Sequence, residues 1–319
     1  MKDAFNRKID YMRISITDRC NLRCKYCLPE HIEFIPHRDV LRYEELLRIC
    51  KIMSELGVKN IRVTGGEPLL RKDCMVFLEA LRGMDKIENI ALTTNALLLK
   101  PYVNQLVKMN LNSINISLDV LDAHSYKDMT GSDDFKLAWE SIEEVLKTDL
   151  KLKINCVPIK GINDREIVKI AGLAKTNKID VRFIELMPSS SNTSLKGMSS
   201  EEILQILKKE FPDIAPSESK NGFGPARYYK SKELMGTVGF ISALSNNFCE
   251  DCNRIRLTSE GFLRLCLHHN LGLDLKELIR GGKTDEEITA KIIECVNQKP
   301  QKHELGTKIN LKHMSKIGG

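Results

Sequence analysis

Three closely spaced cysteines stand near the start of the chain, in the segment CNLRCKYC. Cys20, Cys24 and Cys27 are separated by three and by two residues. Thiolates are soft ligands that suit zinc or an iron–sulfur cluster. A structural zinc ion needs four protein ligands, so His31 or His37 would have to complete such a site. A cubane cluster has four irons, so three cysteines would leave one iron open to an outside ligand such as a substrate.

A second set of three cysteines lies in the last third of the chain. The segment FCEDCNRIRLTSEGFLRLC contains Cys249, Cys252 and Cys266. Zinc ribbons also use Cys-x2-Cys pairs, so this segment alone leaves zinc and a second cluster equally open. The following CLHHN places His268 and His269 directly after the last cysteine, where either could be a fourth ligand and close the site. The alternative is that both histidines are polar residues of a surface loop.

The elements that would position these cysteines alternate between short β-branched runs and helical patterns, which is typical of βα units and a parallel sheet. The expected strands are YMRISIT (11–17), NIRVT (60–64), IALTTN (90–95), SINISLD (113–119), KLKINCV (151–157) and VRFIELM (181–187). Apolar periodicity predicts helices at residues 43–57, 73–84, 99–109, 134–148 and 164–177. Six units instead of eight predict an incomplete (β/α)6 barrel.

Each strand divides into an apolar face and a polar face, because successive side chains point to opposite sides. The polar face collects Arg13, Ser15, Thr17, Arg62, Thr64, Thr93, Asn95, Asn115, Ser117, Asp119, Lys153 and Asn155. A closed eight-stranded barrel fills its interior with branched apolar side chains, so a polar inner face predicts a lumen filled by a ligand. The alternative is an open sheet whose polar face meets water. Helices normally cover both faces of such sheets, which argues against it.

Motifs with chemical potential follow the ends of these strands. The first cysteine set follows the first strand, TGGEP follows the second, and at or after the ends of the remaining four come Asn95, Asp119, Lys160 and Met187. Reactive groups of parallel α/β folds lie where strands end and βα loops begin. We therefore expect one site at this rim.

Cations gather on the same inner face. Arg254 and Arg256 stand two residues apart and would share a face of an extended segment, and Arg13, Arg62 and Lys153 bring the cations to five, against few evident inner carboxylates. Guanidinium groups suit polyphosphate because their planar fork binds it bidentately. No GxxxxGK[ST] run is present. The expected ligand is a nucleoside polyphosphate that is held and not hydrolysed.

Composition limits the class of protein. The 319 residues are 42% hydrophobic, and 49 basic against 43 acidic residues give a net charge of +6. This charge is too small for a nucleic-acid-coating protein, and no apolar run is long enough for a membrane span, so neither nucleic acid nor a membrane is an expected partner. Ten cysteines point to metal sites or buried thiols in a reducing, cytoplasmic compartment. A polar linker, SSSNTSLKG, predicts a boundary near residue 190, with domains 1–190 and 191–319.

The CxxxCxxC motif after the first strand and TGGEP after the second resemble the radical S-adenosylmethionine (SAM) superfamily. The resemblance implies a [4Fe-4S] cluster on Cys20, Cys24 and Cys27, whose open iron chelates the methionine part of SAM. An electron from the cluster then cleaves SAM to a 5′-deoxyadenosyl radical. The implied SAM-site residues are Tyr26 beside the cluster, the Gly66 backbone, Ser117 and Met187. Met187 also suits an ordinary apolar rim position.

Further segments are similar, in register over nearly the whole chain, to the family of GTP 3′,8-cyclases of molybdenum cofactor biosynthesis. They are DRCNLRCKYC, IRVTGGEPLLR, LTTN, NISLD, KGIND, FCEDCNRIRL and the terminal MSKIGG. This resemblance implies removal of hydrogen from the ribose 3′ carbon of GTP, attack of that carbon on guanine C8, and reduction to 3′,8-cyclo-7,8-dihydro-GTP. It also implies a second [4Fe-4S] cluster on Cys249, Cys252 and Cys266 whose open iron binds the guanine edge.

The same family resemblance assigns the remaining site residues. The implied GTP contacts are Arg13, Arg62, Thr93, Lys153, Arg254 and Arg256. The double-glycine tail, Gly318 and Gly319, would enter the active site near Arg13. One departure is Ala96, where the family commonly has glycine after TTN.

Partners follow from the resemblance as well. They are a one-electron donor of unknown identity and the next enzyme of the pathway, cyclic pyranopterin monophosphate synthase, which would accept the product. The oligomeric state stays open, with a homodimer as one expectation. Two alternatives to the main interpretation are another radical SAM enzyme with auxiliary clusters, such as a peptide maturase, and a zinc-binding interaction protein without catalysis.

Overall fold

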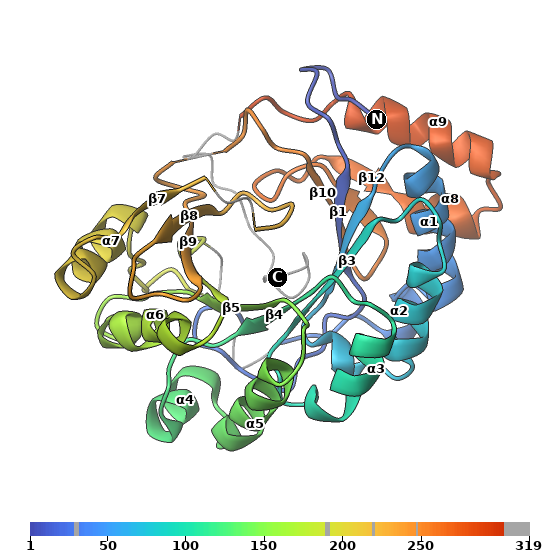
Figure 1. Ribbon diagram of the computed structural model, residues 1–319. Coiled ribbons are helices and arrows are strands. Elements are labelled where there is room, and N and C mark those ends of the chain that lie inside the picture. The colour runs from blue at the N-terminus through green and yellow to red at the C-terminus, as the bar shows by residue number, and fades with distance from the viewer. Residues whose placement is uncertain (29–31, 189–191, 219–220, 247, 303–319) are drawn as a thin grey trace. The chain divides into compact units, whose positions relative to one another are not determined.

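The structure is a computed structural model that describes residues 1–28, 32–188, 192–218, 221–246 and 248–302 (Figure 1). Its contacts group the chain into two compact units. Unit 1 takes in Met1–Asn21, Glu30–Thr93 and Cys249–Gly319, and unit 2 takes in Leu22–Pro29 and Thr94–Phe248, as far as these ranges are described. The boundary near residue 190 stays a prediction about sequence domains. In the described part of the chain no helix has the length and apolarity needed to cross a bilayer.

Unit 1 contains a mixed sheet in the order β12-β11-β10-β1-β2-β3. The strands are β1 (Tyr11–Ser15), β2 (Asn60–Thr64), β3 (Asn89–Thr94), β10 (Arg254–Leu257), β11 (Phe262–Arg264) and β12 (Gly272–Asp274). β10, β1, β2 and β3 run parallel, whereas β11 and β12 are antiparallel additions. The strand that carries Arg254 and Arg256 therefore lies directly beside the first strand of the chain.

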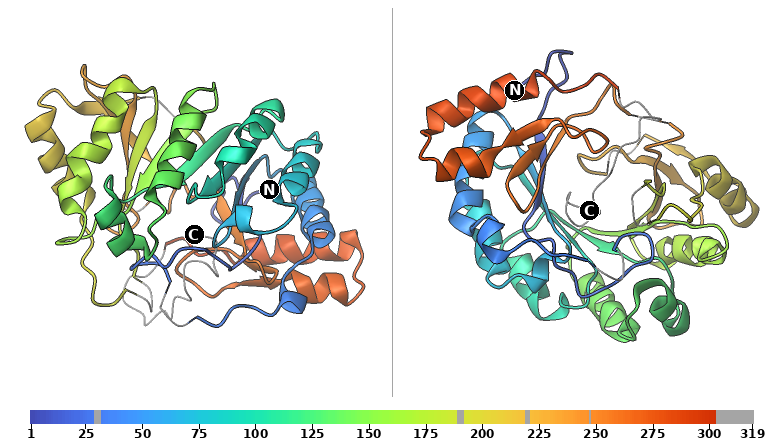
Figure 2. Two further views of the ribbon diagram at one scale, coloured as in Figure 1. Left: turned by 90° about the horizontal axis from the view of Figure 1, so that it is seen from below. Right: turned by 180° about the vertical axis from the view of Figure 1, so that it is seen from behind.

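Helices of unit 1 come from both ends of the chain. They are α1 (Tyr43–Glu55), α2 (Cys74–Arg82), α8 (Leu275–Arg280) and α9 (Asp285–Val296), with short 3-10 helices η1 (His37–Asp39) and η2 (Pro68–Leu70). α1 packs on α2 and on α8, and α8 packs on α9. Both views of Figure 2 keep the red helices α8 and α9 beside the blue α1. The C-terminal helices thus extend the helical layer that the βα units begin.

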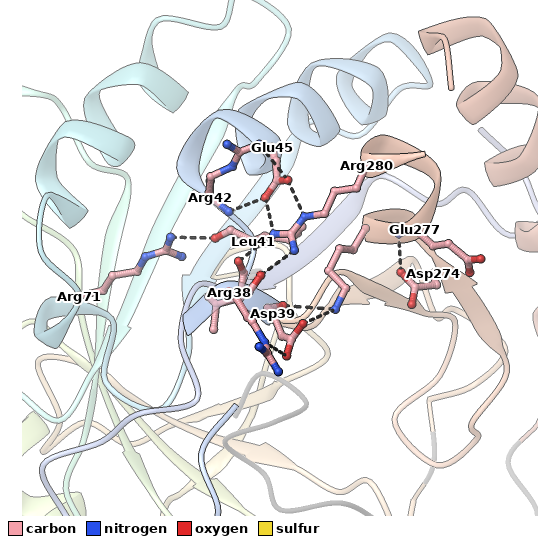
Figure 3. Close-up of polar contacts among 11 residues, drawn as sticks. Arg38, Asp39, Leu41, Arg42, Glu45, Arg71, Asp274, Glu277 and Arg280 are labelled. Carbon is pink, nitrogen blue, oxygen red and sulfur yellow. Dashed lines mark hydrogen bonds and ion pairs between the residues drawn. The ribbon is translucent and has the colours of Figure 1, made fainter. Parts of the chain in front are cut away.

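An ion pair between the buried Glu45 and Arg280, whose side chain is 33% exposed, joins α1 to α8 (Figure 3). Arg280 donates from Nε to Glu45 Oε1 at 2.8 Å and from Nη2 to Glu45 Oε2 at 3.1 Å. The Arg42 amide donates to the same carboxylate at 2.7 Å, which closes a capping box at the start of α1. Arg280, followed by the other donors, outweighs the effect of burial and lowers the pKa of Glu45 to about 2.

Unit 2 contains the sheet order β4-β5-β6-β9-β8-β7. Its strands are β4 (Ser113–Ser117), β5 (Leu152–Cys156), β6 (Asp180–Ile184), β7 (Ala215–Ser217), β8 (Arg227–Lys230) and β9 (Thr237–Ile241). Its helices are η3 (Lys100–Tyr102), α3 (Val103–Lys108), α4 (Ala123–Thr130), α5 (Phe135–Leu146), η4 (Asp164–Glu166), α6 (Ile167–Thr176) and α7 (Ser200–Glu210). The first four strands in the order are parallel, and β8 and β7 form an antiparallel extension.

The six strands and five helices expected from the sequence are confirmed, with ends shifted by a few residues. α4 was missed because AHSYKDMT has a weak apolar period; Asp122 caps it by accepting from the Ser125 amide at 2.9 Å. The alternation of helices and strands does not end with the sixth predicted strand. α7 and β9 continue it, and β9 pairs in parallel with β6. The β7–β8 hairpin lies between α7 and β9 in the sequence, so the regular spacing of a βα unit is lost there.

Both faces of the strands are buried. On the apolar face Ile14, Val63 and Ile154 are fully enclosed, and on the polar face Asn115 and Lys153 are 0% and 3% exposed. The alternative in which the polar face meets water is therefore wrong for these residues. Burying charged side chains requires compensation from partners or a ligand.

Candidate active site

A row of arginines crosses four neighbouring strands of unit 1. In the parallel ladders Arg13 of β1 stands opposite Arg62 of β2 and Arg256 of β10, and Arg256 stands opposite Arg264 of the antiparallel β11. Directly opposite residues share one face, about 4.8 Å apart. We call Arg62, Arg13, Arg256 and Arg264 the arginine row. Arg254, two residues before Arg256, lies on the same face as this row.

Like charges at this spacing oppose one another. Burial, followed by the Arg254 charge, lowers the pKa of Arg256 to about 10. Burial and the Arg256 charge likewise hold the pKa of Arg13 well below its usual range. Two unit charges about 5 Å apart repel by about 3 kcal/mol at an effective dielectric constant of 20. An anion placed against this face would remove the repulsion.

Tyr11 is an aromatic partner of the arginines that the sequence argument missed. Its ring lies 5.8 Å from the Arg62 guanidinium carbon and 5.4 Å from that of Arg254. Burial alone would raise the pKa of Tyr11, but the arginine charges, led by Arg62, outweigh it and lower the pKa. The period-two pattern of YMRIS places Tyr11 on the same face as Arg13, so parity could have found it.

The second cysteine set lies next to this face in unit 1. Arg264 donates to the carbonyl oxygen of His269 at 2.8 Å and thereby holds the loop that follows Cys266. Burial alone would raise the pKa of the Cys252 thiol, but the charges of Lys299 and Arg254, with a backbone hydrogen bond from Arg254 and the charge of Arg7, lower it. A lowered pKa favours the thiolate, which is the form that binds metal. The donor set therefore fits an iron–sulfur cluster.

His268 is 5% exposed, so the interpretation of both histidines as surface residues is wrong for His268. His31 lies outside the described residues. Within the described ranges, no three His, Cys, Asp or Glu side chains come together closely enough to hold a single metal ion. All ten cysteines are thiols, and Cys50, Cys74, Cys156 and Cys295 are buried, whereas the six of the two sets are half-buried.

In unit 2, Tyr26 is fixed between Cys24 and Cys27. Its hydroxyl donates to Asp119 Oδ2 at 2.9 Å, and its ring packs on the apolar cluster of Met129, Ile159 and Leu186. Burial, the Asp119 charge and the two cysteine thiolates raise the pKa of Tyr26 well above its usual value.

Asp119 follows β4 and ties the Tyr26 hydroxyl to the end of β5. Its Oδ1 accepts from the Val157 amide at 2.8 Å. Burial raises the pKa of Asp119 to about 6, even though hydrogen bonds from Val157, Tyr26 and Cys156 favour the charged form. The carboxylate thus fixes the aromatic ring that lies between the two cysteines.

The GGEP turn that begins at Gly65 follows β2 in unit 1 and packs against the backbone just before Cys20. A β-carbon on Gly66 would lie 2.3 Å from the Arg19 carbonyl oxygen, which no side chain tolerates. Gly66 donates its amide to the Thr17 carbonyl at 2.7 Å, and Glu67 donates to that of Arg19 at 2.8 Å. Glycine is thus required because Gly66 closely approaches the backbone of Asp18 and Arg19. The contact of Gly66 with SAM stays a prediction.

Met187 and Ser117 both lie in unit 2. Met187 is 7% exposed, and Ser117 is half-buried at the end of β4. Asn192 Nδ2 donates to the carbonyl oxygens of Met187 at 2.9 Å and Tyr26 at 3.2 Å. The predicted polar linker therefore contributes a buried side chain, Asn192, that links the backbone of Tyr26 to that of Met187. The composition of the linker did not indicate this contact.

Lys153 of β5 has an acidic partner. Its Nζ lies 3.5 Å from Asp180 Oδ2 and also contacts the Asn221 carbonyl. Asp180 stands opposite it at the first position of β6, one residue before the predicted start of that strand. The expectation of few inner carboxylates is wrong here. Arg182, a further buried cation, donates to Asn115 Oδ1.

Thr93 and Ala96 flank the end of β3. Thr93 is half-buried, and the described residues offer its Oγ1 no hydrogen-bond partner. Ala96 has a φ of 71°, in the left-handed region that favours glycine, and is fully buried. The Ala96 amide donates to Thr94 Oγ1 at 3.0 Å, and its carbonyl accepts from Ser141 Oγ at 2.7 Å. The positive φ is what would favour glycine at this turn, and the two hydrogen bonds hold the alanine in it.

Comparisons with known proteins agree with this arrangement. The sequence profile of the radical SAM superfamily matches residues 14–174, and that of Molybdenum Cofactor Synthesis C matches residues 179–305. The GTP 3′,8-cyclases of Clostridium perfringens and Thermodesulfovibrio yellowstonii are 41% and 42% identical over 323 and 324 residues, with both chains of each pair fully covered. The crystal structure of Streptococcus suis SuiB bound to S-adenosylmethionine shares the fold, with a TM-score of 0.64, 16% identity, and coverage of 92% of this chain and 68% of that chain.

The fold and the profile define the class: this is a radical SAM enzyme, with a mixed α/β partial barrel and a C-terminal domain. Membership of the class implies a [4Fe-4S] cluster and SAM as cofactors. Full-length identity narrows the class further, and the chain belongs to the GTP 3′,8-cyclases of molybdenum cofactor biosynthesis. This membership decides against the peptide maturase and the zinc-binding protein.

Proposed function

We propose that the chain converts GTP into 3′,8-cyclo-7,8-dihydro-GTP with two [4Fe-4S] clusters and SAM. The observation that supports this most strongly is the arginine row, in which Arg62, Arg13 and Arg256 stand side by side on β2, β1 and β10. Like charges at this spacing repel one another, so this face favours binding of an anion. The triphosphate of GTP is an anion of suitable charge, and guanidinium forks bind it bidentately.

The first cluster would be held by Cys20, Cys24 and Cys27, and the second by Cys249, Cys252 and Cys266. The lowered pKa of Cys252 and the half-buried state of all six cysteines support thiolate ligation. When bound, the first cluster and SAM supply the radical that removes the ribose 3′ hydrogen. Tyr26, Gly66, Ser117 and Met187 would hold SAM, with the Asp119 contact fixing the Tyr26 ring and Asn192 fixing the Met187 backbone.

GTP would be held by Arg13, Arg62, Thr93, Lys153, Arg254 and Arg256. Arg13 and Arg62 would also act as catalytic residues, because they keep the substrate aligned while hydrogen is removed. Lys153 differs in role, since its pairing with Asp180 leaves less charge for a phosphate and suits orientation of the substrate by hydrogen bonding.

The reaction conserves atoms in a simple way. One hydrogen atom leaves C3′, the C3′–C8 bond forms, and one electron and one proton are then added to the guanine. The product is therefore an isomer of GTP. The added electron requires a one-electron donor, and the labile product requires an acceptor, for which the next enzyme, cyclic pyranopterin monophosphate synthase, is the proposed partner. A reducing, cytoplasmic compartment suits six thiol ligands, and a homodimer is the proposed assembly.

Gly318 and Gly319 lie outside the described residues, and their role is proposed from sequence. Without side chains they could enter a narrow cavity near Arg13. Deleting both is expected to leave iron content and melting temperature unchanged while product falls by orders of magnitude. A normal amount of product from the shortened chain would instead show that the tail is an ordinary frayed terminus without a role in catalysis.

The test is anaerobic incubation of the reconstituted protein with SAM, dithionite and GTP, followed by chromatographic separation of nucleotides. The expected result is a new compound with the mass of GTP but a different retention time, formed together with 5′-deoxyadenosine. Because the product is an isomer, its fragmentation must show ribose and base joined by a second bond. Formation of 5′-deoxyadenosine without this compound would contradict the proposal.

A further inference from the structure

Lys299 is a buried cation close to the second cysteine set. The residue is 2% exposed. Its Nζ donates to the carbonyl oxygen of Arg254 at 2.9 Å and also to that of Leu265. Leu265 directly precedes Cys266, and Arg254 lies two residues after Cys252. The ammonium group therefore links the two chain segments that carry these cysteines.

The neighbouring Arg7 has a carboxylate partner, whereas the ion pairs of the described residues give none to Lys299. Arg7 pairs with Asp3 at 2.6 Å and donates to the carbonyl oxygens of Cys249 at 2.8 Å and Pro300 at 2.7 Å. Arg7 thus anchors the backbone beside Cys249 to the segment that contains Lys299. Its own charge is already compensated.

A buried ammonium without a carboxylate is costly unless another negative group lies nearby. The three cysteine thiolates are the obvious candidates, because Lys299 Nζ binds the carbonyl groups of Arg254 and Leu265, two residues after Cys252 and one before Cys266. Three thiolates on a cubane cluster carry an excess of negative charge, and reduction adds one more. The potential of such a cluster depends on the net charge and the hydrogen bonds around it.

We propose that Lys299 is a positioning residue that supplies the counter-charge of the second cluster and raises that cluster's reduction potential, with Arg7 holding it in place. The inference rests on the proposed assignment of that cluster to Cys249, Cys252 and Cys266. A lysine that only tethered the backbone would act through its hydrogen bonds to two carbonyl groups. A counter-charge acts through its positive charge, and the two roles respond differently to substitution.

The first test is a redox titration of the second cluster alone, followed by electron paramagnetic resonance, in a chain with Cys20, Cys24 and Cys27 changed to Ala. Lys299→Met and Lys299→Gln are expected to shift the reduction potential of the second cluster to more negative values. Lys299→Arg keeps the positive charge, so its potential is expected to stay close to that of the chain with Lys299. The control is Lys302→Met, because Lys302 is exposed and pairs with Glu250 at 3.7 Å. Equal potentials in the Met, Gln and unsubstituted chains would overturn the inference.

The second test needs no loaded cluster and compares melting temperatures. In the chain with Cys249, Cys252 and Cys266 changed to Ala, Lys299→Met should leave the melting temperature unchanged or raise it, because an uncompensated buried charge is removed. In the cluster-loaded chain the same substitution should lower it. A drop of equal size in both chains would assign Lys299 a tethering role only. Unchanged iron content after the three cysteine substitutions would instead overturn the cluster assignment itself.

Discussion

The members of the arginine row lie where strand pairing places them. Arg13, Arg62 and Arg256 occupy equivalent positions of three parallel strands, so their side chains emerge side by side. Burial lowers the pKa of Arg13 and of Arg256, and neighbouring charges, led by Arg256 for Arg13 and by Arg254 for Arg256, lower it further. A polyanion placed against these arginines would reduce their mutual repulsion.

Arg256→Ala is expected to weaken GTP binding at least tenfold, because a charge-assisted hydrogen bond contributes about 1.5 to 3 kcal/mol. Isothermal titration of GTP under anaerobic conditions measures this. Iron content and SAM cleavage should stay unchanged, since the cysteines are untouched. Arg38→Ala is the control, because the Arg38 side chain is 88% exposed in the same unit. Equal losses in both variants would point to a general charge effect instead of a phosphate contact.

Adding a single β-carbon at Gly66 tests the packing of the GGEP turn against the backbone before Cys20. A β-carbon there would meet the Arg19 carbonyl oxygen at 2.3 Å, so Gly66→Ala must displace the backbone beside Cys20. We expect destabilisation of about 2 kcal/mol or more, with loss of SAM cleavage. Gly172→Ala is the matched control, because a β-carbon at that position in α6 meets nothing within 4 Å. It should stabilise the chain by about 0.5 to 1 kcal/mol, measured by denaturant unfolding.

The contact between α1 and α8 connects the first βα unit to the C-terminal domain within unit 1. Glu45 is 4% exposed and accepts hydrogen bonds from Arg280 and from the Arg42 amide. Because both helix ends meet at this one carboxylate, its charge matters more than that of a surface pair. Figure 3 also shows the adjoining contacts of Arg71 with the Leu41 carbonyl, at 2.8 Å, and of Asp274 with the Glu277 amide.

The pH dependence of this contact has a definite sign. The pKa of Glu45 is lowered from 4.5 to about 2 on folding, so its stabilisation is complete above about pH 4.5 and disappears as the pH falls toward 2. Because solvent screens the exposed Arg280, Glu45→Gln should cost about 1 to 2 kcal/mol at pH 7, and this difference should stay constant down to about pH 5. Urea unfolding of both chains at several pH values measures it. A difference that already vanishes at pH 6 would contradict the lowered pKa.

Sequence reasoning identified the strands and most of the charged face, and physical reasons explain the rest. Parity within a strand placed Arg13 and Arg62 correctly, because side-chain alternation is a local property. Arg264 and Lys299 could not be found in this way, since their positions depend on an antiparallel register and on a contact across 45 residues of sequence. Asp180 was missed through an error of one residue in a strand start, and the left-handed turn at Ala96 has no signal in an alanine.

The two cysteine sets predict a definite iron content for the molecule. Two cubane clusters predict on the order of eight irons per chain when both are loaded. Changing Cys20, Cys24 and Cys27 to Ala should remove about half of the iron and all cleavage of SAM. Changing Cys249, Cys252 and Cys266 should remove the other half and leave cleavage of SAM detectable. Iron analysis with Mössbauer spectroscopy decides this, and cleavage by the first triple variant would exclude the first assignment.

The central claim is that hydrogen is removed from the ribose 3′ carbon of GTP and that the product keeps all other atoms. The most direct measurement is an anaerobic turnover with GTP deuterated at C3′, followed by mass analysis of both products. The account predicts that 5′-deoxyadenosine gains one deuterium and that the GTP isomer contains none. Unlabelled 5′-deoxyadenosine, or a nucleotide product that retains the deuterium, would contradict it.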